Sequence, residues 1–209
     1  MIKGIHYYTG LTLAIYIGTH LLNHLLILHS EAMHINFMQK ARRVYRHPIV
    51  EGVLLTAVML QILSGLFLVT QKWSKADSWF DWAQICSGLY LSLFLTYHVR
   101  AVMVGRHKLH IDTNLYYGAG VMNMWPQKLI FIPYYSFAIL AFFFHVACIH
   151  RIKMKEFVPK EVAEQQAIGI MILGSVITLL IIFKMSHLNM PARFIGTADK
   201  NSKDKKMNT

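Results

Sequence analysis

The stretch at residues 5–28 reads IHYYTGLTLAIYIGTHLLNHLLIL and contains no Asp, Glu, Lys or Arg. An α-helix rises about 1.5 Å per residue, so a run of this length covers the roughly 30 Å hydrocarbon core of a bilayer. Four comparable apolar runs follow it, at residues 49–70, 82–104, 129–149 and 167–186. The sequence therefore predicts an all-α fold, an integral membrane bundle of five transmembrane helices within residues 1–190.

Composition agrees with a chain that faces lipid. Hydrophobic residues make up 55% of the sequence and charged residues only 15%, an excess of apolar surface that a soluble domain of this size does not need. The carboxylates lie outside the apolar runs, except Glu51 at the start of the second. Carboxylates buried in a membrane usually mark proton relays and ion-coupled carriers. Their absence from the middle of the runs argues against a pump or an antiporter.

The formal net charge of +11 is divided among loops that flank the apolar runs and a lysine-rich end. This distribution favours membrane lipids as partners and not nucleic acid. Residues 191–209 form a basic polar tail, which we expect to be disordered because it has little to bury. Most of the 21 Lys and Arg residues fall on the side of the C-terminus, so the positive-inside rule predicts an outside N-terminus.

Histidines supply the candidate chemistry. His20 and His98 lie deep in the first and third runs, which cross in the same direction, at similar distances from their starts. Two imidazoles at equal depth can bind one haem iron from opposite faces, which gives a low-spin b-type centre suited to electron transfer. The alternative is that each imidazole forms a hydrogen bond with a backbone carbonyl or a Ser or Thr on a neighbouring helix. His24, one turn beyond His20, is an alternative ligand.

His145 is a further candidate ligand, on the fourth run, which crosses in the opposite direction. Its natural partner would come from the second run, where the large polar residue at mid-span is Gln61, four residues before Gly65. Glutamine is a poor ligand for haem iron. The residues therefore predict one haem and leave a second in doubt.

These motifs resemble the five-helix cytochrome b membrane subunit of succinate dehydrogenases and fumarate reductases. That family has a haem-ligating histidine late in helix one, as in IGTHLLN at 17–23, in helix three, as in TYHV at 96–99, and in helix four, as in FFHV at 143–146. In two-haem members the helix-one and helix-three ligands hold one haem, and the helix-two and helix-four ligands hold the other. Gln61 stands at the helix-two position. The resemblance covers about residues 1–185 and implies one haem b, with iron ligands His20 and His98.

The resemblance also implies a role. Family members hold no catalytic residue in this subunit; they anchor a flavoprotein and an iron–sulfur protein, and pass electrons between these and a membrane quinone. In bacteria the anchor lies in the inner (cytoplasmic) membrane, with the start of helix one on the cytoplasmic side, opposite to the orientation that the charge count predicts. Guanidinium groups near the haem would pair with its propionates, or would contact lipid headgroups instead. The candidates are Arg42, Arg43, Arg46 and Arg106.

Two other readings remain open. One is a haem-free helical membrane protein whose buried histidines are structural. The other is a b-type cytochrome of a different quinone-linked oxidoreductase. Visible absorption of the purified protein separates the first from both cytochrome readings, and copurifying subunits separate the cytochromes from each other.

Overall fold

The computed structural model describes residues 1–191, which are mostly helical and contain no β-strand. The elements in chain order are α1 (Ile2–Leu25), the 3-10 turn η1 (Leu26–Leu28), α2 (Glu31–Tyr45), α3 (Pro48–Lys72), the 3-10 turn η2 (Trp73–Lys75), α4 (Trp79–His107), α5 (Leu115–Asn123), α6 (Lys128–Met154) and α7 (Lys160–Met185). The expected disorder of the tail at 191–209 lies outside the described residues, apart from Pro191.

Five segments are long and apolar enough to cross a membrane. They are Ile2–Leu28, Pro48–Lys75, Trp79–His107, Lys128–Met154 and Lys160–Met185. Each contains one predicted run, apart from the last residue of the fifth run, Ser186, which follows α7. The predicted fold class, an all-α bundle with five membrane-spanning helices, is thus confirmed, and the chain is a multi-pass membrane protein.

Two further helices, α2 and α5, lie in segments that the hydropathy pattern gave as polar connections. Local capping starts both of them. The Ser30 hydroxyl accepts a hydrogen bond from the Met33 amide at the start of α2, and the Asn114 side chain accepts one from the Tyr116 amide at the start of α5. Each cap satisfies one of the amides that a helix leaves unbonded in its first turn. These short signals define helices that are too short or too polar to span a bilayer.

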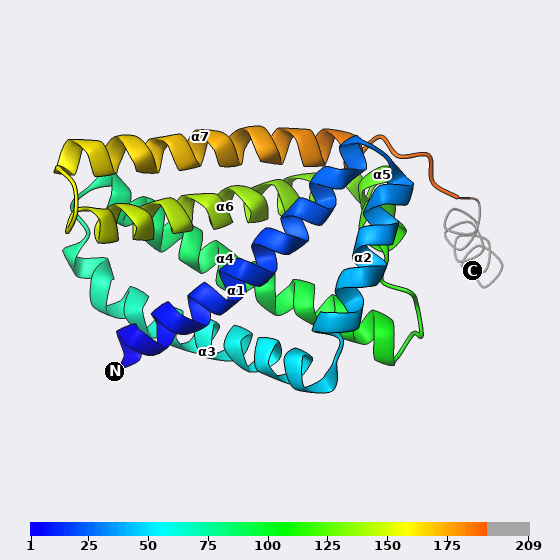
Figure 1. Cartoon of the computed structure of the whole chain (residues 1–209), viewed down its shortest axis with the longest axis horizontal. Coiled ribbons are helices and arrows are strands. Elements are labelled where there is room, and N and C mark those ends of the chain that lie inside the picture. Colours follow the sequence, from blue (N-terminus) through cyan, green and yellow to red (C-terminus); the bar gives the residue numbers. More distant parts are fainter. Residues whose placement is uncertain (192–209) are drawn as a thin grey trace, which may run out of the picture.

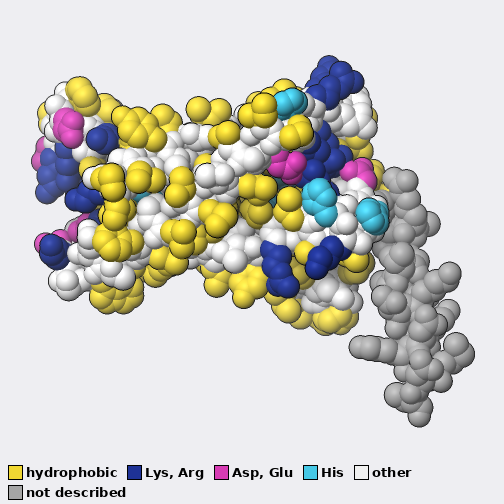
Figure 2. All heavy atoms as spheres, turned by 90° about the horizontal axis from the view of Figure 1, so that it is seen from below, with side chains coloured by type: hydrophobic (Ala, Val, Ile, Leu, Met, Phe, Trp, Pro, Cys, Tyr) yellow, Lys and Arg dark blue, Asp and Glu magenta, His cyan; other side chains and the backbone are white. Residues whose placement is uncertain are grey.

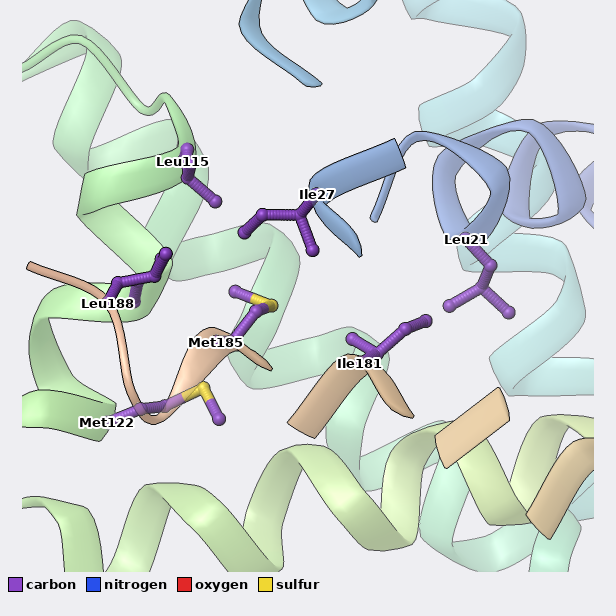
Figure 3. Packing of buried hydrophobic residues seen from close by; sticks show 8 residues of the cluster. Leu21, Ile27, Leu115, Met122, Ile181, Met185 and Leu188 are labelled. Carbon is purple, nitrogen blue, oxygen red and sulfur yellow. The ribbon is translucent and has the colours of Figure 1, made fainter. Parts of the chain in front are cut away.

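The spans form a bundle in which α6 and α7 run antiparallel along one side, and α1 crosses diagonally (Figure 1). The helix α2 stands across one end of the bundle, close to α5. Figure 3 shows how that end is held together: Ile27 of η1 lies near Leu115 of α5 and Met185 of α7, and Ile27 and Leu115 are almost fully buried. This cluster fixes the two short helices against the spans.

The outside of the bundle suits a lipid environment. Over the face that Figure 2 shows, hydrophobic side chains cover the middle, whereas Lys and Arg side chains gather towards the ends. On α7, Leu179 is 71% and Phe183 67% exposed. Large apolar side chains so far out of the core are typical of surfaces that contact acyl chains.

Gly174 of α7 provides a test of the α6–α7 contact. A Cβ at this position would overlap the side chain of Phe143 on α6, whereas a Cβ on Gly169, one and a half turns earlier, would meet nothing within 4 Å. We expect Gly174→Ala to destabilise the bundle by about 1–3 kcal/mol, the usual cost of overpacking. Gly169→Ala should leave stability unchanged or slightly higher, because alanine favours helix. Thermal unfolding in detergent measures both, and an equal effect of the two changes would contradict the packing.

Candidate functional site

A cavity of about 300 Å³ lies inside the bundle at the end that α2 crosses. Its walls come from α1, α2, α3, α4, α6 and α7 and from the residues around the start of α5, and most lining side chains are apolar. Four of its polar side chains are histidines, and two arginines and a glutamate lie there as well: His20, His24, His34, His98, Arg46, Arg106 and Glu51. A largely apolar cavity with a few converging polar groups is the usual form of a cofactor site.

His20 of α1 and His98 of α4 both line this cavity and lie near each other. Their ring centroids lie 6.5 Å apart and their planes are inclined by 60°. The two rings that the sequence paired by depth thus lie close together at this cavity.

The hydrogen bonds expected under the structural alternative are absent at His98. Neither of its ring nitrogens forms a hydrogen bond with any residue of 1–191; the ring stacks on Phe94, at a centroid distance of 4.9 Å, and meets Tyr135 edge-on. An imidazole in apolar surroundings without a partner is costly. Ligation of a metal would give it one.

His20 has one polar neighbour. Its Nε2 lies 3.2 Å from Nε2 of His24, one turn along α1, and its ring stacks on Tyr16. Within residues 1–191, no group of three or more His, Cys, Asp or Glu side chains converges to hold a metal ion. A porphyrin supplies four of the iron's ligands and needs only two from the protein. The donor set therefore fits a haem better than a bare metal ion.

Several polar residues at this cavity were missed by the sequence analysis, and two of them, His34 and Asn23, contact each other. His34 of α2 is 1% exposed, and its Nε2 lies 3.3 Å from Nδ2 of Asn23 on α1. Burial, with the charges of His20 and Arg42 adding to it, lowers the pKa of His34 to about 4, so the ring is neutral at pH 7. Asn23 was recoverable from the sequence because it follows His20 by three residues on the same helix face. His34 was not, because α2 itself was not predicted.

The four arginine candidates differ in whether they line the cavity. Arg46 and Arg106 line it. Arg106 forms a bidentate ion pair with Glu51, whereas Arg46 has only a 3.1 Å hydrogen bond to the Thr113 hydroxyl, and no ion pair within residues 1–191. Burial, and then the nearby charges of Arg42 and Arg106, lower the pKa of Arg46. Arg46 is therefore the cation best placed to receive an anionic group of a ligand.

The other two candidates do not reach the cavity. Arg42 bonds the Asp112 carboxylate and the Thr113 carbonyl, each at 2.7 Å, and so joins α2 to the segment before α5. Arg43 is not among the lining residues. Neither is positioned to contact a ligand inside the bundle.

His145 has a partner that the sequence analysis missed. At the opposite end of the bundle its ring lies 6.4 Å from that of His6, with an interplanar angle of 76°. Gln61, which the family pattern placed opposite His145, instead contacts His6, with 3.1 Å between its Nε2 and the ring Nε2, and accepts a hydrogen bond from Thr9. His6 gave no signal in the sequence because it stands at the very start of its run, outside the depth argument.

Unlike His98, both of these histidines are held by hydrogen bonds from other helices. Nδ1 of His6 lies 2.9 Å from the Ser64 hydroxyl, and Nδ1 of His145 lies 3.2 Å from the Ser87 hydroxyl. Each ring also lies against a glycine: Cε1 of His6 is 3.1 Å from the place of a Cβ on Gly65, and Cε1 of His145 is 3.2 Å from that on Gly88. This end fits the structural alternative.

Leucine substitutions test this difference between the two ends of the bundle, because they remove hydrogen bonds at His6 but none at His98. His6→Leu takes a partner from Gln61 and from Ser64, so in protein prepared without haem we expect a loss of roughly 1–2 kcal/mol in stability. His98→Leu removes no hydrogen bond and should change the unfolding temperature little. Thermal unfolding of the two variants beside wild type is the measurement, and an equal loss in both would contradict the distinction.

Comparisons with models of known protein families, with curated proteins and with solved structures found no match to this chain. Its function is therefore inferred from its own side chains.

Proposed function

We propose that this protein is a haem b membrane anchor of a succinate dehydrogenase or fumarate reductase type complex. In this role it passes electrons between soluble flavin and iron–sulfur subunits and a membrane quinone, in the inner membrane of a bacterium. The observation that carries the proposal is the pair formed by His20 and His98. The two rings line one cavity with their centroids 6.5 Å apart, and His98 forms no hydrogen bond within residues 1–191.

Each part of the cavity has a task in this proposal. Imidazole nitrogens of His20 and His98 would hold the iron, which when bound supplies a one-electron carrier. Phe94 and Tyr135 contact the His98 ring and restrict its orientation. Arg46, at the mouth, would receive a propionate. The apolar lining excludes water and lowers the local dielectric, which tunes the potential of a haem.

Membership of an electron-transfer complex is supported by the residue motifs and by the form of the site. The cavity offers two imidazoles, and a haem that both of them held would be suited to electron transfer, not to oxygen chemistry. The soluble partners would supply the catalytic centre, and this chain the path to the quinone. The hydrogen-bonded pair of His6 and His145 favours the structural reading at its own end and limits the proposal to one haem.

The first test is a reduced-minus-oxidised visible spectrum of the purified protein, with haem quantified per chain. We expect sharp low-spin b-type bands and one haem per chain, both lost in His20→Ala and in His98→Ala. The matched variants His6→Ala and His145→Ala should keep the bands, because those rings are held by protein groups. A colourless wild type, purified from cells supplied with haem, would refute the cytochrome proposal. Copurification of a flavoprotein and an iron–sulfur protein separates this complex from another b-type cytochrome.

The second test concerns the anionic end of the haem. Arg46→Gln removes the cavity arginine that has no carboxylate partner within residues 1–191. We therefore expect faster haem loss and a lower haem content after purification. Arg43→Gln is the matched control, since Arg43 does not line the cavity and should keep the wild-type content. Haem content after a fixed time in detergent measures the effect. Equal retention in both variants would exclude Arg46 as a propionate partner.

A further inference from the structure

A groove of about 530 Å³ lies on the outside of the bundle, between α1 and α3. The helices touch at one end of it, where the place of a Cβ on Gly10 is 3.1 Å from Nε2 of Gln61. Because α1 crosses the bundle diagonally, the two helices diverge from there towards Pro48 (Figure 1). The groove is the space that this divergence leaves open. It is lined by Tyr8, Thr9 and Thr12 of α1 and by residues of α3 between Pro48 and Leu60.

The length of the groove matches one leaflet of a bilayer. Pro48 is the first residue of α3, and the 12-residue rise from it to Leu60 covers about 18 Å. Half of the hydrocarbon core is about 15 Å. One acyl chain of a lipid can therefore lie along the groove. A helix of another protein would cross both leaflets and would continue past Gln61, where α1 and α3 close on each other.

The lining of the groove is suited to an apolar chain. Val53 is 55% exposed, and a Cβ on Gly52 would meet nothing within 4 Å. Thr12 donates its hydroxyl proton to the carbonyl of Tyr8, one turn earlier on α1. The hydroxyl of Thr9 is likewise bonded, to Gln61 at 2.7 Å. These two threonines do not need a polar partner from a ligand.

Two cations without a partner precede the open end of the groove in the chain. Lys40 and Arg43 lie one turn apart on α2, and both are exposed. Neither forms an ion pair or a side-chain hydrogen bond within residues 1–191. The one carboxylate between residues 32 and 76 is Glu51, which is paired with Arg106. The charges of Lys40 and Arg43 are therefore not neutralised by the protein around them.

The position of α2 brings these cations to the level of lipid headgroups. The helix lies across the end of the bundle (Figure 1), with His34 and Met38 buried and Val44 65% exposed. An amphipathic helix in this position lies in the membrane interface. Its end is held close to the groove, because the ring of Tyr45 lies 5.5 Å from that of Tyr16, one turn beyond Thr12 on α1.

We propose that this groove, with Lys40 and Arg43, binds an anionic phospholipid. One acyl chain lies along α3, and the phosphate receives hydrogen bonds from the ammonium and guanidinium groups. Charge complementarity selects the lipid, because basic groups at the membrane surface attract anionic headgroups. The groove shares no residue with the lining of the cavity around His20 and His98. The lipid site therefore does not depend on the proposed haem.

The test compares two lipids with the same acyl chains. Native mass spectrometry of detergent-solubilised protein, titrated with dioleoylphosphatidylglycerol or dioleoylphosphatidylcholine, gives the Kd of each. We expect wild type to bind one phosphatidylglycerol about tenfold more tightly than phosphatidylcholine. The double variant Lys40→Gln with Arg43→Gln should lose this preference, because its headgroup end is neutral. Gly52→Leu should weaken both lipids about tenfold or more, because leucine fills the groove.

Matched controls carry the same changes elsewhere. Lys155→Gln removes an exposed lysine at the end of α6, and Gly169→Leu adds a side chain on α7 where a Cβ meets nothing within 4 Å. Neither residue lines the groove, so both controls should keep the wild-type Kd for each lipid.

Several outcomes would overturn the lipid site. They are equal affinity of wild type for the two lipids, an unchanged Kd in Gly52→Leu, and a lipid-free dimer that Gly52→Leu dissociates, which would assign the groove to a second copy of the chain. If a variant fails to fold, photolabelling of wild type with a diazirine-bearing phosphatidylglycerol decides. Label within residues 8–12 or 40–60 supports the site, and label confined to other residues overturns it. A colourless wild type that passes these tests keeps the lipid site and refutes only the cytochrome.

Discussion

The bilayer offers no hydrogen bonds to the groups placed inside it, and this constraint governs the rest of the structure. The backbone meets it by forming helices. Isolated hydroxyls meet it locally, since Thr12 and Thr19 each bond the carbonyl one turn earlier on α1. Side chains with greater polar capacity need partners from other helices. Among the described residues, histidine rings from different spans come together at two places, the contact around His6 and His145 and the cavity around His20 and His98.

Histidine has a different role at each of these two places, because the neighbouring side chains differ. Around His145 the rings have hydroxyl and amide partners and lie tightly against glycines, so the helices close on each other. Around His98 the neighbours are aromatic rings, and the helices enclose a space. Depth in the membrane shows that a histidine is costly. Only the packing shows whether the protein itself satisfies it.

The sequence was sufficient for the spans and for the similar depth of His20 and His98, because helix rise and crossing direction fix depth. It was insufficient wherever rotation about a helix axis decides contact. The position of Arg46 at the cavity, and of Arg43 away from it, follows from the orientation of α2, a helix that hydropathy does not reveal. The contact of His6 with Gln61 likewise depends on how α1 and α3 pack. Residue type gave candidates, and the packing of α2 and α1 selected among them.

The two short helices are joined by contacts that span a long stretch of chain. The Tyr116 hydroxyl donates to the Glu31 carboxylate at 2.7 Å, and Arg42 pairs with Asp112. Both contacts link α2 to residues that are synthesised after α4. During translation, His20 and His98 therefore emerge before the end of the bundle can be fastened over them. Biogenesis therefore includes an interval in which both imidazoles have been made and neither of these two contacts has formed, and the haem of the proposed function would enter in that interval without breaking either contact.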